Sequence, residues 1–178
     1  MFYLISGGSG SGKSEYAEHI AMKLRDDKKD FLYIATMIGY DEEAKKKIQR
    51  HRDMRKDKQF QTVECFTNLL GLNLAPECTV LLDCMSNLTA NEMFQENGAK
   101  EHTVEEVVKG VDHILKKCRN LVIVTNEIFS DGCQYDEVTK AYIRTLGNIN
   151  TSLGKRADAV VEVTCGIPIY HKGKEVAI

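Results

Sequence analysis

The chain has 178 residues, of which 43% are hydrophobic and 28% charged, with only two prolines. These values predict one globular domain spanning residues 1–178 and exclude fibrous and intrinsically disordered proteins. The formal net charge of -2 excludes a general attraction to nucleic acid or to an anionic membrane, so anion binding would depend on a local cluster of charge.

The first elements predicted along the chain are a strand, a glycine loop and a helix. Phe2 to Ser6 form a short apolar run, which two glycines end and helix-forming residues follow. A second apolar run, Phe31 to Thr36, predicts another strand. Asp41 then stands as an N-cap before two acidic residues that suit a first helical turn, so we expect a helix from about Asp41 to Arg55.

Three later runs predict further strands of the same sheet. Thr79 to Leu82, Leu121 to Thr125 and Ala159 to Thr164 are each rich in Val, Leu and Ile, and helical patterns separate most of the predicted strands. The runs are continuous rather than alternating, which is typical of parallel strands buried on both faces. We therefore expect an α/β fold with three layers, in which helices cover both faces of a mostly parallel central sheet.

Two features of the second half of the chain refine this prediction. Thr103 and Glu106 have the spacing of a capping box, and an apolar residue then recurs every three or four positions. This pattern predicts a helix that begins near Thr103 and has one apolar face. The C-terminal sequence IPIYHKGKE predicts an edge strand or a hairpin.

The cysteines and the N-terminus bear on the cellular compartment. The MFYLISGG start has no cationic leader, and its apolar run is too short for a signal peptide or a membrane span. The cysteines are scattered singly, without the spacing of a zinc site or a disulfide framework. We therefore expect a cytoplasmic protein with no membrane span, in which the reduced core thiols are Cys65, Cys78, Cys84, Cys118, Cys133 and Cys165.

The glycine loop has the pattern of a phosphate-binding loop. GGSGSGKS fits G-x-x-x-x-G-K-[ST], follows a predicted strand and opens a predicted helix. Backbone N–H groups of such a loop bind phosphate oxygens, Lys13 reaches the outer phosphates, and the Ser14 hydroxyl ligates Mg²⁺. A flexible glycine-serine turn is the alternative. The nucleotide-binding residues expected here are Gly7, Gly8, Ser9, Gly10, Ser11, Gly12, Lys13 and Ser14.

A second magnesium ligand is expected at the end of another strand. Asp83 ends the apolar run CTVLLD, where P-loop enzymes hold a carboxylate for the metal. The alternative is an ordinary polar residue that closes a buried strand. Ser14 and Asp83 are thus the predicted Mg²⁺ ligands.

Residues 45–58, KKKIQRHRDMRKDK, concentrate positive charge in a chain that is otherwise near neutral. Three interpretations stay open: a solvated helix face, a site that handles phosphate, and a nucleic-acid patch, which the lack of an aromatic platform disfavours. His51 lies between two arginines, which disfavour the imidazolium and so keep the ring nucleophilic. If Arg52 and Arg55 hold a triphosphate, a ring nitrogen can attack the alpha phosphorus and expel pyrophosphate. A surface histidine without a catalytic role is the alternative.

An ordered set of short motifs, which runs nearly the length of the chain, resembles one family. The motifs are GGSGSGKS, YIAT from Tyr33, IQRHRD from Ile48, TVE from Thr62, LLDC from Leu81, VTNE from Val124, Gly147, Asn150, ADAVVEV and GIPI. The set resembles the adenosylcobinamide kinase/adenosylcobinamide-phosphate guanylyltransferase family of cobalamin biosynthesis, which has a RecA-like P-loop NTPase fold. The resemblance implies phosphorylation of adenosylcobinamide by a nucleoside triphosphate, followed by transfer of GMP from GTP onto that phosphate.

The resemblance also implies site residues, matched by motif position. His51 matches the guanylylated histidine, and Glu127 would orient magnesium or the acceptor hydroxyl, with a solvent-facing loop acid as the alternative. His51, Lys13 and Glu127 are therefore the expected catalytic residues. The nucleotide-contacting positions implied outside the glycine loop are Thr36, Met37, Arg52, Arg55, Glu64 and Asp83.

The partners implied by the resemblance are Mg²⁺ as cofactor, GTP and/or ATP as substrates, and adenosylcobinamide as the small-molecule acceptor. No nucleic acid is implied, and the chain is expected to form a homo-oligomer such as a trimer.

Several positions depart from the family's pattern. Gly10 stands where an arginine is common, and Ile143 and Arg144 stand where an Arg-Asp pair is usual. The other departures are Met54, Lys56, Phe60 and Thr151. They motivate one alternative, a P-loop small-molecule kinase that lacks guanylyl transfer. Another alternative, a nucleotide-switched binding module, follows from the many functions that P-loop folds support.

Overall fold

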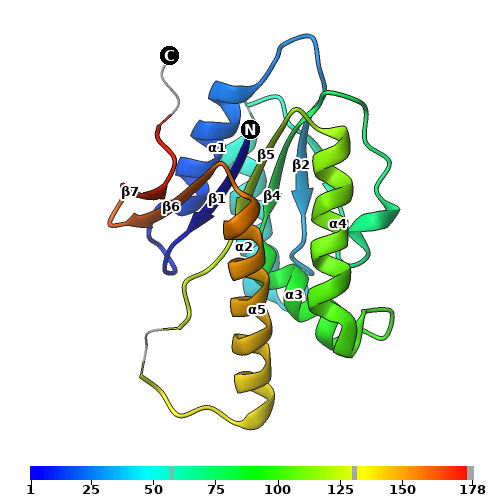
Figure 1. The fold of residues 1–178 in the computed structure, drawn as a ribbon, viewed down its shortest axis with the longest axis vertical. Coiled ribbons are helices and arrows are strands. Elements are labelled where there is room, and N and C mark those ends of the chain that lie inside the picture. Colours follow the sequence, from blue (N-terminus) through cyan, green and yellow to red (C-terminus); the bar gives the residue numbers. More distant parts are fainter. Residues whose placement is uncertain (57, 130–131, 176–178) are drawn as a thin grey trace.

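The computed structural model describes residues 1–56, 58–129 and 132–175, in which strands and helices alternate along most of the chain (Figure 1). The strands are β1 Phe2–Ser6, β2 Phe31–Ala35, β3 Gln61–Glu64, β4 Thr79–Asp83, β5 Asn120–Val124, β6 Ala159–Thr164 and β7 Ile167–Lys172. The α-helices are α1 Lys13–Leu24, α2 Glu42–Arg55, α3 Met85–Phe94, α4 Thr103–Lys117 and α5 Glu137–Arg156, with short 3₁₀ turns η1 Leu69–Gly71 and η2 Lys100–His102.

The strands form one seven-stranded sheet in the order β3-β2-β4-β5-β1-β6-β7. All neighbouring strands pair in parallel except β6 and β7, which pair antiparallel. Strands β1, β2, β4 and β5 are buried along almost their whole length, as their continuous apolar sequences predict. The mostly parallel sheet and the C-terminal edge strand are therefore confirmed.

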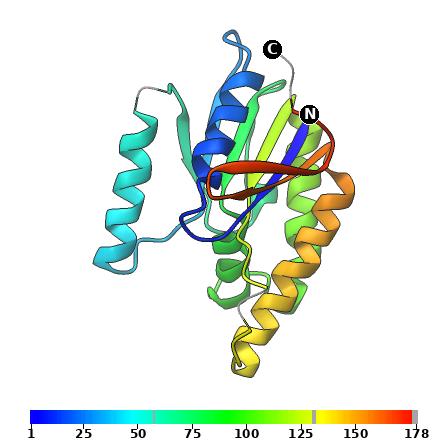
Figure 2. The ribbon, with the colours of Figure 1, turned by 90° about the vertical axis from the view of Figure 1, so that its left-hand side faces the viewer.

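Helices cover both faces of the sheet (Figures 1 and 2). On one face, Ala17, Ile20 and Ala21 of α1 pack against alternate residues of the central strands. The apolar sides of α3, α4 and α5 pack on the other face. Helix α2 lies on the α1 side but stands away from the sheet in Figure 2. The three-layer arrangement predicted from the sequence is confirmed.

The strand register places the carboxyl ends of five strands at one edge of the sheet. Glu64 pairs with Ala35, Ala35 with Asp83, and Asp83 with Val124. Val124 in turn pairs with Ile5, next to the residue at which β1 gives way to the glycine loop. Ligands of open α/β sheets bind at this edge, so the fold gathers the predicted site residues where a ligand would lie.

Two local predictions are wrong. Helix α4 does begin at Thr103, but the Thr103 hydroxyl donates to the Lys100 carbonyl at 2.6 Å, and the N-cap, His102, makes no side-chain capping bond. The capping box therefore does not form, because the Thr103 hydroxyl is hydrogen-bonded to the 3₁₀ turn directly before the helix. Cys133 and Cys165 are exposed rather than in the core, since both lie in connections between elements.

The predicted N-cap of α2 is confirmed, since an Asp41 carboxylate oxygen accepts the Ala44 N–H at 2.7 Å. Within the described residues, no helix combines the length and the apolarity that crossing a membrane requires.

Candidate active site

The glycine loop between β1 and α1 is packed so tightly that Gly7 has no room for a side chain without a shift of its neighbours. A Cβ on Gly7 would lie 2.5 Å from Ser11 Oγ and 2.6 Å from the Val163 carbonyl oxygen. Gly12 has a φ of 91°, which favours glycine. The Ser11 carbonyl accepts a hydrogen bond of 2.9 Å from the Gly166 N–H, so the turn between β6 and β7 braces the loop.

Polar groups of this loop point inward. Lys13 opens α1, is 8% exposed, and donates from Nζ to the Gly8 carbonyl at 2.9 Å. The Ser11 hydroxyl oxygen is buried and has no hydrogen-bond partner among the described residues. Lys13 and the N-terminus of α1 give this loop the chemistry expected of an anion-binding nest.

Asp83 is a point at which the carboxyl edge of the sheet contacts α2. It ends β4, which β5 separates from β1, and its side chain is only 11% exposed. The Tyr33 hydroxyl donates to Asp83 Oδ2 at 2.9 Å, and His51 Nδ1 lies 3.5 Å from the same oxygen. The structure therefore places His51 at the carboxyl edge of the sheet. The sequence predicted only the two flanking arginines as charged neighbours of the ring. The structure adds the Asp83 carboxylate.

Thr36 holds the backbone around Asp83 in place. Its hydroxyl donates to the Cys84 carbonyl and accepts from the Cys84 N–H, both at 2.8 Å, and its carbonyl accepts from Asn91 Nδ2 at 2.8 Å. Burial, with a smaller effect of the Asp83 carboxylate, raises the pKa of the Cys84 thiol to about 11, so this thiol stays neutral. The nucleotide-contacting role of Thr36 and of the half-buried Met37 stays a prediction.

A second contact joins α2 to the sheet. Arg52 Nη2 lies 3.1 Å from Glu64 Oε1, and both side chains are about half exposed. Two of the predicted nucleotide-contacting residues are thus in contact with each other. The Arg55 side chain, also predicted to contact nucleotide, lies outside the described part of the structure.

Glu127 lies beside the glycine loop. Its N–H donates to the Gly7 carbonyl at 3.0 Å, which fixes the chain after β5 against the end of β1. A carboxylate oxygen accepts the Phe129 N–H at 2.9 Å. The backbone of this predicted catalytic residue is therefore in direct contact with the glycine loop.

The predicted magnesium ligands have suitable chemistry. The Ser14 hydroxyl and the Asp83 carboxylate are hard oxygen donors, which Mg²⁺ prefers. Within the described residues, no group of three or more His, Cys, Asp and Glu side chains is placed to hold a metal by itself. The residues fit Mg²⁺ in its usual mode, with one or two protein ligands and the rest from phosphates and water.

The contact of Tyr33 with Asp83 could not be predicted from the sequence. The alternation of β2 places Tyr33 and Ala35 on the face that carries α1, but only the pairing of β2 with β4 brings the hydroxyl to Asp83. No local pattern in the sequence gives that pairing.

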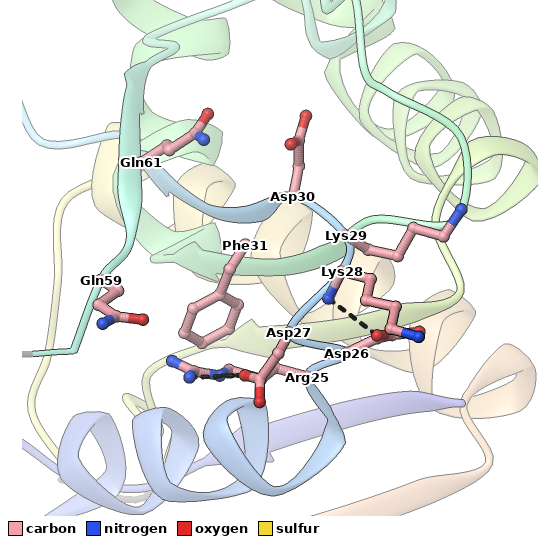
Figure 3. A pocket seen from close by; sticks show the side chains of 9 residues that line it. All are labelled: Arg25, Asp26, Asp27, Lys28, Lys29, Asp30, Phe31, Gln59 and Gln61. Carbon is pink, nitrogen blue, oxygen red and sulfur yellow. Dashed lines mark hydrogen bonds and ion pairs between the residues drawn. The ribbon is translucent and has the colours of Figure 1, made fainter.

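A separate cavity lies at the opposite end of the strands and does not belong to the site (Figure 3). Its volume is about 290 Å³, and it opens where β2 and β3 begin. The Arg25 guanidinium binds Asp27 and lies 5.8 Å from the centre of the Phe31 ring. Its lining residues, Arg25, Asp26, Asp27, Lys28, Lys29, Asp30, Phe31, Gln59 and Gln61, carry three basic and three acidic groups. This balance gives no preference for phosphate.

Solved structures with a similar fold include ATPases. A KaiC-like protein from Pyrococcus horikoshii has a TM-score of 0.51 at 12% identity, over 98% of this chain and 79% of that one. An ATPase domain also has a TM-score of 0.51 at 12% identity, over 90% of this chain and 68% of the matched chain. The fold is therefore a RecA-like α/β fold.

Relatives in sequence are more specific. The chain is 30% identical to the bifunctional adenosylcobalamin biosynthesis protein CobU of Salmonella typhimurium, over 97% of this chain and 100% of the relative. It is 28% identical to CobU of Escherichia coli over the same shares, and 25% identical to CobP of Pseudomonas aeruginosa over 96% and 97%. The family model described as cobinamide kinase / cobinamide phosphate guanyltransferase matches residues 3–170. The chain therefore belongs to the cobinamide kinase / cobinamide phosphate guanyltransferase family.

Proposed function

We propose that this chain phosphorylates adenosylcobinamide with a nucleoside triphosphate and then transfers GMP from GTP onto that phosphate through a guanylyl-His51 intermediate. One observation carries the proposal: His51 Nδ1 lies 3.5 Å from Asp83 Oδ2, at the sheet edge that holds the phosphate-binding nest. A histidine on a separate helix is thereby brought toward the place where a triphosphate would bind.

In this proposal the two ring nitrogens of His51 have different tasks. Asp83 faces Nδ1 and orients the ring, which leaves Nε2 as the nucleophile. In the first half-reaction, Nε2 attacks the alpha phosphorus of GTP and the bond to pyrophosphate breaks. A phosphate oxygen of adenosylcobinamide phosphate then attacks the same phosphorus, the N–P bond breaks, and the imidazole is regenerated.

The kinase step uses the nest and its neighbours. Lys13 would neutralise the outer phosphates, and Ser14 with Asp83 would hold Mg²⁺, which supplies positive charge to the transferred group. Glu127, adjacent to Gly7, would accept the proton of the acceptor hydroxyl. Arg52 and Arg55 would bind GTP on the α2 side.

Three further features belong to the proposal. GTP and/or ATP serve as phosphate donors, the protein acts in the cytoplasm, and it assembles as a homo-oligomer such as a trimer. The oligomer is supported only by the resemblance stated above, and sedimentation of the purified chain tests it.

The test is a mass measurement of the product formed from adenosylcobinamide, GTP and Mg²⁺. The proposal predicts a product that carries GDP, because one phosphate comes from the kinase step and GMP from the second. A product that carries phosphate alone would reduce the function to a small-molecule kinase. If no corrinoid product forms and the chain binds a macromolecule in a nucleotide-dependent way, the result would instead favour a nucleotide-switched binding module.

A further inference from the structure

A cavity of about 280 Å³ adjoins the phosphate-binding nest and has no assigned role. Its lining residues are Glu127, Ile128, Tyr135, Thr139, Tyr142 and Ile143. The chain that enters it is fixed to β1, since the Thr125 N–H donates to the Ile5 carbonyl at 2.9 Å and the Glu127 N–H to the Gly7 carbonyl at 3.0 Å. One of its lining residues, Glu127, is therefore held directly beside Gly7 of the glycine loop.

One wall is a face of α5. Thr139, Tyr142 and Ile143 are separated by three and four positions, so they lie side by side on the helix. The Tyr142 hydroxyl donates to the Ser86 carbonyl at 3.2 Å, which anchors this wall to α3. Burial raises the pKa of Tyr142 to about 12, so the phenol remains a neutral donor at physiological pH. The other wall comes from Glu127, Ile128 and Tyr135, which lie between β5 and α5.

The lining is mostly apolar and has an acidic rim. Two isoleucines and two tyrosine rings supply the apolar surface, while the Glu127 carboxylate and the Thr139 hydroxyl are polar. None of the described lining residues is a lysine or an arginine. Such a cavity disfavours a triphosphate and suits an uncharged group that carries a hydroxyl.

Large apolar side chains extend this surface outside the cavity. Phe129, next to Ile128, is 45% exposed, and Val138, next to Thr139, is 61% exposed. The Phe129 ring lies against α5 at Gly147, one turn beyond Ile143. Exposed apolar side chains beside a cavity indicate a ligand larger than the cavity itself.

The geometry points to this cavity as the acceptor site of the kinase step, where it binds the uncharged, alcohol-bearing end of the corrinoid. The assignment depends on the proposed function, because it takes cobinamide as the acceptor. The acceptor hydroxyl oxygen attacks the gamma phosphorus of the bound nucleoside triphosphate, the bond to the beta-phosphate oxygen breaks, and the nucleoside diphosphate leaves. Glu127 takes the hydroxyl proton.

The test fills the cavity from the α5 wall. Thr139→Trp adds bulk inside it, and Ala141→Trp adds the same bulk at an exposed position of the same helix that does not line it. Two readouts are compared: the KM for cobinamide in its phosphorylation, and the transfer of label from alpha-labelled GTP to the protein, which needs no acceptor. The assignment predicts a rise in KM of about tenfold or more for Thr139→Trp alone, with labelling unchanged.

The possible results distinguish a failure of the proposed function from a failure of the acceptor-site assignment. If the unmodified chain does not phosphorylate cobinamide, the proposed function fails and the assignment fails with it. If it does, and the KM of Thr139→Trp equals that of Ala141→Trp, the acceptor site lies elsewhere. Should Thr139→Trp also lose labelling, Ile143→Ala decides: a raised KM for cobinamide with normal labelling supports the cavity, and an unchanged KM overturns it.

Discussion

The phosphate-binding loop and helix α2 are held by the rest of the molecule in very different ways. The loop leaves no room for a Cβ at Gly7, rests on the β6–β7 turn, and places a nearly buried lysine, Lys13, at the start of α1. In α2, by contrast, none of the described side chains is fully buried, and only Ala44, Ile48 and His51 are half-buried.

One small sheet thus supports two kinds of chemistry with unequal rigidity. The glycine loop is packed against the core, where a change propagates into the fold. The proposed nucleophile lies on α2, whose described contacts with the sheet include the half-exposed Arg52–Glu64 pair and the approach of His51 to Asp83. The two activities should therefore be separable by mutation, and the two regions should differ in local stability.

The largest expected effect is the separation of the two activities. Lys13→Ala removes the cation that serves both reactions, so cobinamide phosphorylation and guanylyl labelling should each fall about 10²–10³-fold. His51→Ala should abolish labelling while phosphorylation stays within about twofold of the unmodified rate. Both rates are measured on the same preparations. Lys23→Ala, in the last turn of α1, is the matched control, and equal losses of both activities in His51→Ala would show that α2 is part of the kinase site.

A pair of neighbouring glycines tests how tightly the loop is packed. Gly7→Ala places a methyl group 2.5 Å from Ser11 Oγ and 2.6 Å from the Val163 carbonyl, whereas a Cβ at Gly8 meets nothing within 4 Å. Gly7→Ala should lower the free energy of unfolding by about 1–3 kcal/mol. Gly8→Ala should change it by less than about 0.5 kcal/mol. Urea unfolding measures both, and equal effects would mean that the loop is not packed as described.

Hydrogen exchange compares the two regions directly. Because α2 buries no described side chain, its amides should exchange at least about tenfold faster than those of α1 and α4, which have buried faces. Peptide-level exchange followed by mass spectrometry measures the ratio. Equal protection of α2 and α1 in the purified chain would show that α2 is held by contacts beyond those described, for example from a second subunit.

The smallest effect is expected at the contact between α2 and β3. Arg52 and Glu64 are each about half exposed at 3.1 Å, and surface pairs of this kind contribute little. A double-mutant cycle with Arg52→Ala and Glu64→Ala should give a coupling energy below about 1 kcal/mol in unfolding. A coupling of several kcal/mol would show that this pair, and not the helix surface, fixes α2.

Much of the fold could be predicted from local patterns. Each strand predicted as a buried apolar run lies within one residue of its observed bounds, because burial between two helical layers demands continuous apolar sequence. The glycine loop could also be predicted, because Lys13 and Ser14 stand at the spacing of the phosphate-binding motif, between a strand and a helix. The predicted capping box at Thr103 is wrong because the Thr103 hydroxyl donates to the Lys100 carbonyl in the preceding 3₁₀ turn, which the sequence pattern does not indicate.

The rest of the site depends on contacts between distant segments. The approach of His51 to Asp83 and the Tyr33 hydrogen bond to the same carboxylate follow from strand order and from the path of α2. Neither contact can be predicted from the spacing of residues in the sequence. The exposure of Cys133 and Cys165 likewise depends on how connections lie on the finished sheet.

The central claim, that His51 becomes guanylylated, is tested most directly by locating the label after incubation with alpha-labelled GTP and Mg²⁺. We predict an acid-labile, alkali-stable label on the peptide that contains His51, and none in His51→Ala. Label on another residue, or no label with any divalent cation, would contradict the claim.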